Sequence, residues 1–353
     1  MPPIDAHAHV VSDALVKTLV TEAPEVAPRL KEAGAWHLTY PSGRGSGPVP
    51  AGMFDLTSRV ADMDHQGVAV QAVSVPPTHF FYDAAADRAA LHNDAMVDLA
   101  RQVPDRFRVL ATLPLASPAG SVEELGRLAS EATVVGVELG TNVNGGNLDH
   151  PDLTAVWQAI ADAGLAVVLH PDNVAGADRM GGYYLHNFVG NPTDTTIAAA
   201  SLVFGGVLSA FPALRAVLLH GGGFVPYQLG RFSHGWAVRP EPRQRLQEPP
   251  AALFERFFFD TLTHDRQALR YLIDRFGPDR VAWVATTRSI WAATTRSGRS
   301  ARLLATTRPC SRPSSSARQP ACSSGHQPLP AERYQHDHPH QSLDQRPDRH
   351  HVG

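Results

Sequence analysis

A regular alternation of short apolar runs with stretches of helical spacing constrains the fold of this chain more than any other feature. The runs that are short enough to be strands lie near residues 4–8, 68–75, 107–115, 134–140, 165–170, 214–220, 256–263 and 280–284. Helical spacing fills most of the intervals, for example residues 86–102, 122–132, 153–163 and 266–276. Eight strands in a βα alternation over this length predict an α/β fold, the (β/α)₈ TIM-type barrel.

The pattern changes near residue 284, which predicts two parts. Residues 1–283 carry the alternation and are predicted to form the barrel, incomplete at strand eight, whereas residues 284–353 are predicted to be a separate, disordered tail. Within the first part, residues 11–50 are rich in Gly and Pro toward their end. They predict an insertion after strand one that forms a lid or a small subdomain.

The composition is that of a soluble globular protein, with 43% hydrophobic and 18% charged residues. No run is long enough to cross a bilayer and the N-terminus lacks a secretion signal, so we expect a cytoplasmic protein with no membrane partner. The two cysteines, Cys310 and Cys322, both lie in the tail. The main body therefore has neither a disulfide framework nor a cysteine-based metal site.

The net charge of −3 hides an uneven distribution. Residues 284–353 contain ten arginines, no lysine and four acidic residues, which leaves 21 basic and 30 acidic residues in the body. The body is thus near −9. Because phosphate binding needs clustered cations, this balance argues against a nucleic-acid partner.

Four histidines lie at the ends of predicted strands. His7 and His9 are two residues apart in the first apolar run, so a strand would place both imidazoles on one face. His170 and His220 close the fifth and sixth runs. All four then meet at the C-terminal rim of the barrel, where such folds have their active sites. A lone His-x-His pair is more often a half-exposed strand, but the set favours a site for zinc or a similar divalent ion, of the metallohydrolase type.

Motifs between Ile4 and about residue 281 are similar to those of one known family. They are His7-x-His9 and residues 63–68, 112–114, 170–171, 220–223 and 230–240, of which the last two blocks are the most specific. Through these motifs the chain resembles the decarboxylase branch of the amidohydrolase superfamily, the aminocarboxymuconate semialdehyde decarboxylase-like family.

The resemblance implies a metal centre with defined roles. His7, His9 and His170 would bind one divalent ion, zinc first and manganese as the alternative, together with an aspartate at the end of strand eight. His220 would be the catalytic residue that holds and deprotonates a water molecule at the metal, which suits an imidazole near neutral pH. Asp5 is expected either to orient a ligand histidine or to end a turn.

The implied reaction is the non-oxidative decarboxylation of a small unsaturated or aromatic carboxylic acid, without an organic cofactor. A hydrolase or lactonase of the same superfamily is the alternative, because the same hydroxide can attack a carbonyl carbon. Arg239 matches a family arginine that reaches into the neighbouring subunit and binds a substrate carboxylate, which implies a homodimer. The other interpretation of Arg239 is a surface ion pair. A second substrate-binding arginine has no clean match, and Arg44 is the nearest candidate.

The family motif breaks at strand eight. The family places Gly-Thr/Ser-Asp-Tyr-Pro-Phe after Trp283, but residues 284–291 read Val-Ala-Thr-Thr-Arg-Ser-Ile-Trp and contain no aspartate. With one choice of synonymous codons, a single added G after the Trp283 codon restores Gly-Ser-Asp-Tyr-Pro-Phe-Asp-Met. We therefore predict a reading-frame error, against the alternative of a natural disordered extension. A second alternative for function follows, an inactive product that lacks the strand-eight ligand.

Overall fold

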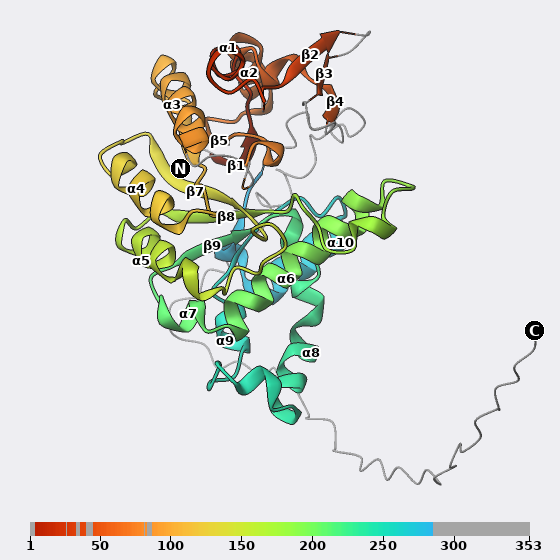
Figure 1. Cartoon of the computed structure of the whole chain (residues 1–353). Coiled ribbons are helices and arrows are strands. Elements are labelled where there is room, and N and C mark those ends of the chain that lie inside the picture. The colour runs from red at the N-terminus through yellow and green to blue at the C-terminus, as the bar shows by residue number, and fades with distance from the viewer. Residues whose placement is uncertain are drawn as a thin grey trace, which may run out of the picture. The chain divides into compact units, whose positions relative to one another are not determined.

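The computed structural model describes residues 4–25, 27–32, 36–39, 45–80, 82 and 87–284. Their main feature is an eight-stranded sheet in a nearly closed barrel (Figure 1). The strands, in the order in which they lie side by side, are β1 (Ile4–His9), β5 (Val70–Ser74), β6 (Phe107–Ala111), β7 (Val134–Gly140), β8 (Ala166–His170), β9 (Arg215–Leu218), β10 (Phe258–Asp260) and β11 (Val281–Ala282).

Every neighbouring pair in this sheet is parallel, and the spatial order follows the chain order. Such connections need crossovers, which helices on the outside of the barrel supply. The helices are α1 (Asp13–Glu22), α2 (Leu56–Gln66), α3 (Asp87–Gln102), α4 (Pro118–Leu128), α5 (Thr154–Asp162), α6 (Asn191–Phe204), α7 (Val207–Ala210), α8 (Val225–Val238), α9 (Ala251–Phe254) and α10 (Arg266–Phe276). The predicted (β/α)₈ barrel is confirmed. The predicted tail beyond residue 284 lies outside the described residues.

The insertion after strand one contains α1 and a small antiparallel sheet. Its strands are β2 (Arg29–Glu32), β3 (Trp36–Thr39) and β4 (Gly45–Val49), and they pair in the order β2, β3, β4. Figure 1 shows this sheet beside α1 and α2, away from the long helices α6 and α8. The insertion thus adds a helix and a three-stranded sheet to the chain between β1 and α2, and its role as a lid or small subdomain stays a prediction.

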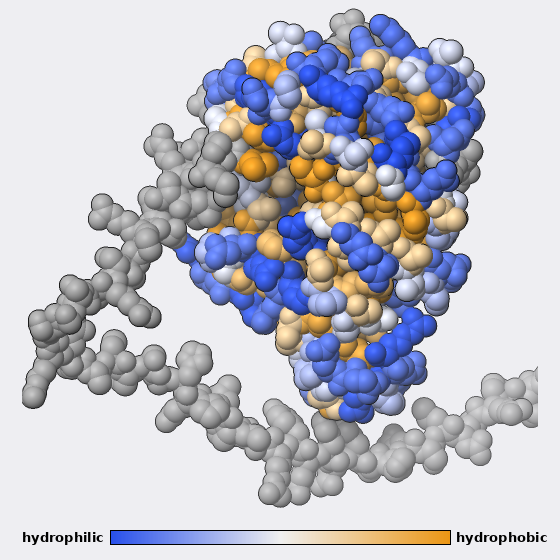
Figure 2. Space-filling model, turned by 90° about the vertical axis from the view of Figure 1, so that its left-hand side faces the viewer, coloured by the Kyte–Doolittle hydropathy of each residue, from blue (hydrophilic) through white to orange (hydrophobic). Residues whose placement is uncertain are grey.

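Two apolar clusters pack against the barrel sheet, one on its outer face and one on its inner face. The larger lies between strands and helices and includes the fully buried rings of Phe107, Trp157, Phe254 and Phe259. The smaller consists of side chains that alternate with the outer set and face inward: Ala72, Leu110, Val168 and Leu219. On the face drawn in Figure 2, a band of apolar residues lies between hydrophilic regions. No helix in the described part of the chain is long and apolar enough to span a membrane.

Some element boundaries differ from the predictions for local reasons. Helix α4 begins at Pro118, four residues before the predicted start, because the Ser117 hydroxyl caps it by accepting from the Gly120 amide. The strand predicted over 256–263 is shortened to the three residues of β10. Strand β9 ends at Leu218, so His220 lies in the turn after the strand and not at its last position.

Candidate metal centre

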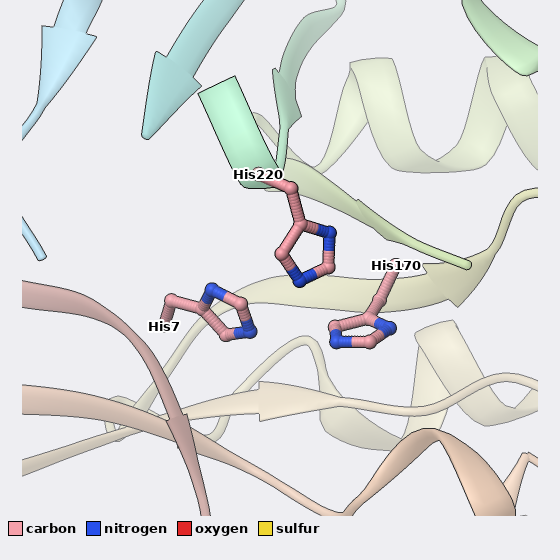
Figure 3. A group of neighbouring side chains, drawn as sticks. All are labelled: His7, His170 and His220. Carbon is pink, nitrogen blue, oxygen red and sulfur yellow. The ribbon is translucent and has the colours of Figure 1, made fainter. Parts of the chain in front are cut away.

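The structure brings the four predicted histidines together at the C-terminal mouth of the barrel. The ring centroids are 5.1 Å apart for His7 and His9, 5.2 Å for His7 and His170, and 5.1 Å for His170 and His220. One ring nitrogen from each of His7, His170 and His220 lies within 4.8 Å of the others. Figure 3 shows these three rings facing a common centre. The ring of His9 lies 5.1 Å from that of His170 and completes the cluster.

A buried polar network fixes the backbone of β1. The Asp5 carboxylate accepts from the His7 amide (3.2 Å) and from the Gln71 side-chain amide (2.9 Å). The Arg59 guanidinium donates to Gln71 (2.8 Å) and to the carbonyl of His9. Burial raises the pKa of Asp5 to about 6 and lowers that of Arg59 to about 10. Asp5 therefore holds the backbone of the first histidine.

Three of the histidines share one feature: each directs its Nδ1 atom at an oxygen acceptor. The contacts are His7 Nδ1 to Asp260 Oδ2 (3.2 Å), His9 Nδ1 to the Val75 carbonyl (3.2 Å) and the Ser74 hydroxyl (3.0 Å), and His170 Nδ1 to the Pro171 carbonyl (2.8 Å). Carbonyl and carboxylate oxygens only accept, so Nδ1 carries the proton and Nε2 keeps its lone pair. The Nε2 atom of His9 is buried and has no hydrogen-bond partner among the described residues. This is the state in which imidazoles bind metals.

His220 differs from the other three. Its Nδ1 atom is buried without a hydrogen-bond partner in the described part of the chain, and Figure 3 shows its Nε2 atom directed between the rings of His7 and His170. The residue has a φ of 57°, in the left-handed region that non-glycine residues rarely adopt. Glycines follow at 221–223, and a Cβ on Gly222 would lie 2.4 Å from a ring carbon of Phe259. The turn thus requires glycine, and it aims His220 at the cluster.

Burial sets the protonation of the cluster. It lowers the pKa of His9 and His170 well below the usual value, helped by neighbouring imidazolium charge, and it lowers the pKa of His220 to about 4. These rings are neutral at pH 7, as a metal ligand or a proton acceptor must be. In His7, burial also acts to lower the pKa, but the hydrogen bond and charge of Asp260 outweigh it and raise the pKa.

Two buried carboxylates beside the cluster were not predicted from the sequence. Asp260 ends β10 and contacts His7, while Glu138 on β7 has an oxygen 3.7 Å from His9 Nδ1. Burial raises the pKa of Glu138 to about 7, against the opposing effects of the His7 charge and the Ser74 hydroxyl. An acidic residue within an apolar run is the signal that could have identified both. Together with Asp5 they place carboxyl groups around the histidines, and the ionised forms of these groups would balance a bound cation.

A cavity of about 940 Å³ opens beside His220. Aromatic side chains line much of it, including Phe188, Phe224, Tyr227 and Tyr271. A few polar groups, His264 among them, lie in the same wall. Apolar walls with few polar groups are typical of a site for a small organic molecule.

The remaining predicted site residues lie elsewhere. Arg239 directly follows α8 and has a largely exposed side chain, and its Nε donates to Glu241 (3.1 Å), so within one chain it forms a surface ion pair. Arg44 lies outside the described residues. Among the residues that the structure describes, carboxylates reach the histidines from β1, β7 and β10, and none does so from β11.

Comparisons with known proteins agree with this geometry. A family model described as amidohydrolase matches residues 4–283 and stops where the sequence departs from the expected strand-eight motif. The chain is 32% identical over 296 residues to 2-amino-3-carboxymuconate-6-semialdehyde decarboxylase of Dictyostelium discoideum, covering 79% of each protein. It is 31% identical over 216 residues to the gamma-resorcylate decarboxylase of Rhodococcus jostii, covering 56% of this chain and 65% of that protein. The crystal structure of Metarhizium anisopliae IDCase in apo form superposes with a TM-score of 0.70 at 26% identity, covering 80% and 83% of the two chains.

Proposed function

The chain belongs to the amidohydrolase family, and from that premise we propose that it is a divalent-metal decarboxylase of a small unsaturated or aromatic carboxylic acid. The relatives supply the reaction class, because both curated relatives described above are decarboxylases. The observation that carries the proposal is the shared orientation of three imidazoles, whose Nδ1 atoms contact oxygen acceptors and whose Nε2 atoms keep their lone pairs.

His7, His9 and His170 are the proposed ligands. Their nitrogen donors suit zinc best, with manganese as the second choice. The buried nitrogen of His9, which has no partner among the described residues, and the buried carboxylates nearby both fit a cation at this point. When bound, such an ion supplies Lewis acidity, which lowers the pKa of water toward neutrality.

His220 is the proposed proton acceptor. Its ring is neutral at pH 7 because burial lowers its pKa to about 4, and it lies in the wall of the aromatic cavity. Nε2, the atom that faces the other two rings, takes the proton from water and holds it beside the substrate. The aromatic walls bind the flat body of the acid and exclude bulk water from the reacting carbon.

The proposal includes a homodimer in which Arg239 binds the substrate carboxylate in the partner's site, with Arg44 as the second candidate. The exposed position of Arg239 at the end of α8 supports this role, because the side chain is available to a second subunit. Mixing an Arg239→Ala subunit with a His220→Ala subunit should restore activity in heterodimers with one intact site. Heterodimers that form but stay inactive would argue for the surface ion pair instead.

The function is tested by incubating the purified chain with zinc or manganese and a panel of aromatic and unsaturated acids. We expect release of carbon dioxide, whereas ring opening of lactones without it would identify the hydrolase alternative. The double variant His7→Ala/His9→Ala should lose bound metal and keep the far-UV circular dichroism of the barrel. His65→Ala, at an exposed position on α2, is the matched control. Unchanged metal content in the double variant would exclude the proposed ligands.

A further inference from the structure

Asp260 uses both of its carboxylate oxygens at the cluster. The side chain is fully buried at the end of β10. Its Oδ2 atom accepts from His7 Nδ1 (3.2 Å), while Oδ1 accepts from the backbone amides of Gly221 (2.6 Å) and Leu262 (3.1 Å). One carboxylate therefore joins three segments of the barrel mouth: β1, the turn after β9, and the residues after β10.

The contact with His7 selects the tautomer of that ring. A carboxylate accepts hydrogen bonds, so the facing nitrogen must carry the proton. The lone pair is then on Nε2, the atom directed at the centre of the cluster in Figure 3. His170 obtains the same orientation from a backbone carbonyl, and His9 from a backbone carbonyl and the Ser74 hydroxyl, so among the three proposed ligands His7 alone receives it from a carboxylate within hydrogen-bond distance.

The contact with Gly221 acts on the other side of the cluster. His220 and the three glycines after it have φ values of 57°, 64°, 79° and 60°, an unusual run of left-handed backbone. For His220 this conformation is strained, and it persists only if surrounding contacts hold it. The 2.6 Å hydrogen bond from the Gly221 amide to Asp260 is such a contact, one residue from the histidine it fixes.

We propose that Asp260 is a positioning residue that sets two members of the cluster at once, the ring of His7 and the turn that carries His220. This inference deepens the proposed function and rests on its metal centre. Two other buried carboxylates beside the cluster are placed differently. Asp5 contacts the backbone of His7, and Glu138 lies 3.7 Å from His9 Nδ1, beyond hydrogen-bond distance.

The test is Asp260→Asn, which keeps the size of the side chain. The amide oxygen still accepts from Gly221, and the amide NH₂ then faces His7, which must present a lone pair at Nδ1 and carry its proton at Nε2. We expect the affinity for Co²⁺, read from its visible absorbance in competition with a chelator, to fall by about 10–100-fold. The matched control is Asp55→Asn, since Asp55 also accepts from two backbone amides but lies exposed at the start of α2. Its Co²⁺ affinity should be unchanged.

A second measurement needs no metal. Long-range ¹H–¹⁵N spectra of the metal-free full chain at alkaline pH report which nitrogen of each histidine carries the proton. We expect Nδ1–H for His7 in the wild type and Nε2–H in Asp260→Asn. His7 with Nε2–H in the wild type would overturn the inference, as would a folded Asp260→Asn with an unchanged tautomer and an affinity within about twofold. If the wild type binds no Co²⁺, the metal centre is refuted, and the His7 tautomer still decides the role of Asp260.

Discussion

The four clustered histidines are not equivalent, because their Nδ1 atoms have different surroundings. Three face oxygen acceptors, and the Nδ1 of His220 has no partner among the described residues. A ring whose orientation comes from its own turn is suited to exchange a proton, whereas a ring fixed through Nδ1 is suited to bind a metal. The geometry thus separates the proposed base from the proposed ligands.

We expect His220→Ala to retain most of the bound metal and to lose at least about a hundredfold in turnover, the usual scale for a general base. Metal content by mass spectrometry and the rate of carbon dioxide release measure the two quantities separately. A loss of metal equal to that of a His7→Ala variant would instead make His220 a ligand.

A second buried pair, His79 and His92, predicts a pH effect on stability. Their ring nitrogens are 3.0 Å apart, and His92 Nδ1 donates to the Arg88 carbonyl (2.6 Å). Burial lowers the pKa of His92 to about 4. Between pH 6.5 and 4 the unfolded chain binds a proton at His92 that the folded chain does not, so the free energy of unfolding falls as the pH falls, by about 3 kcal/mol at most.

His92→Gln should remove this contribution. The difference in unfolding free energy between wild type and variant, from urea titrations at several pH values, should be larger at pH 7 than at pH 4.5. A difference that does not change with pH would show that His92 does not titrate in this window.

For single residues, the sequence predicted where the histidines lie in the fold but not which residues their rings contact. The two-residue spacing of His7 and His9 and the ends of two later runs were sufficient to bring four imidazoles together. The acceptor of His7 is Asp260, 253 residues away, and no local pattern connects the two. Arg239 shows the same limit, because the sequence allowed both a surface ion pair and a role in a partner's site.

Among the elements, the turn after β9, residues 220–223, is the one whose conformation depends most on its glycines. Gly222→Ala places a Cβ at a φ of 79° and against buried Phe259, so we expect a loss of about 2–4 kcal/mol in unfolding free energy and a displaced His220 with low turnover. Gly126→Ala, in the exposed face of α4, meets no atom within 4 Å and should stabilise by about 0.5–1 kcal/mol. Thermal unfolding distinguishes the two, and a tolerated Gly222→Ala would contradict the role of the turn.

Capping residues fix where the helices begin. Helix α10 begins at the predicted residue because Asp265 accepts from the amides of Gln267 and Ala268. Helix α4 was predicted to start too late, although the Ser117-Pro118 pair marks its beginning. The strands before the cluster are shorter than their apolar runs because the backbone leaves the sheet to form the turns of the site.

For the molecule as a whole, the described barrel ends in a two-residue strand, β11, at the point where the family match also ends. An aspartate from strand eight would add an anionic ligand, and the helices that follow in frame would cover the outside of β11. We therefore expect the chain as it stands to be poorly active. One G inserted after the Trp283 codon should raise metal affinity, thermal stability and the rate of decarboxylation together.

Full activity and a folded segment over residues 284–353 in the unaltered chain would refute the frame error. In that case another residue must complete the metal centre.

The βα alternation was sufficient to predict the barrel, because each apolar run and each helical stretch is a local pattern. The tail prediction rests on residues outside the described part of the chain.

The hydrogen bond between His7 and Asp260 also bears on how the protein forms during translation. The two residues are separated by 253 positions, so the contact arises only after almost all of the described chain has left the ribosome. Contacts of such long range form late and slowly, because a large loop must close first. A nascent chain that ends before β10 has His7 without its acceptor. We therefore expect the proposed metal site to form only when synthesis is nearly complete, and pulse-labelled nascent chains of increasing length should acquire metal only after Asp260 emerges.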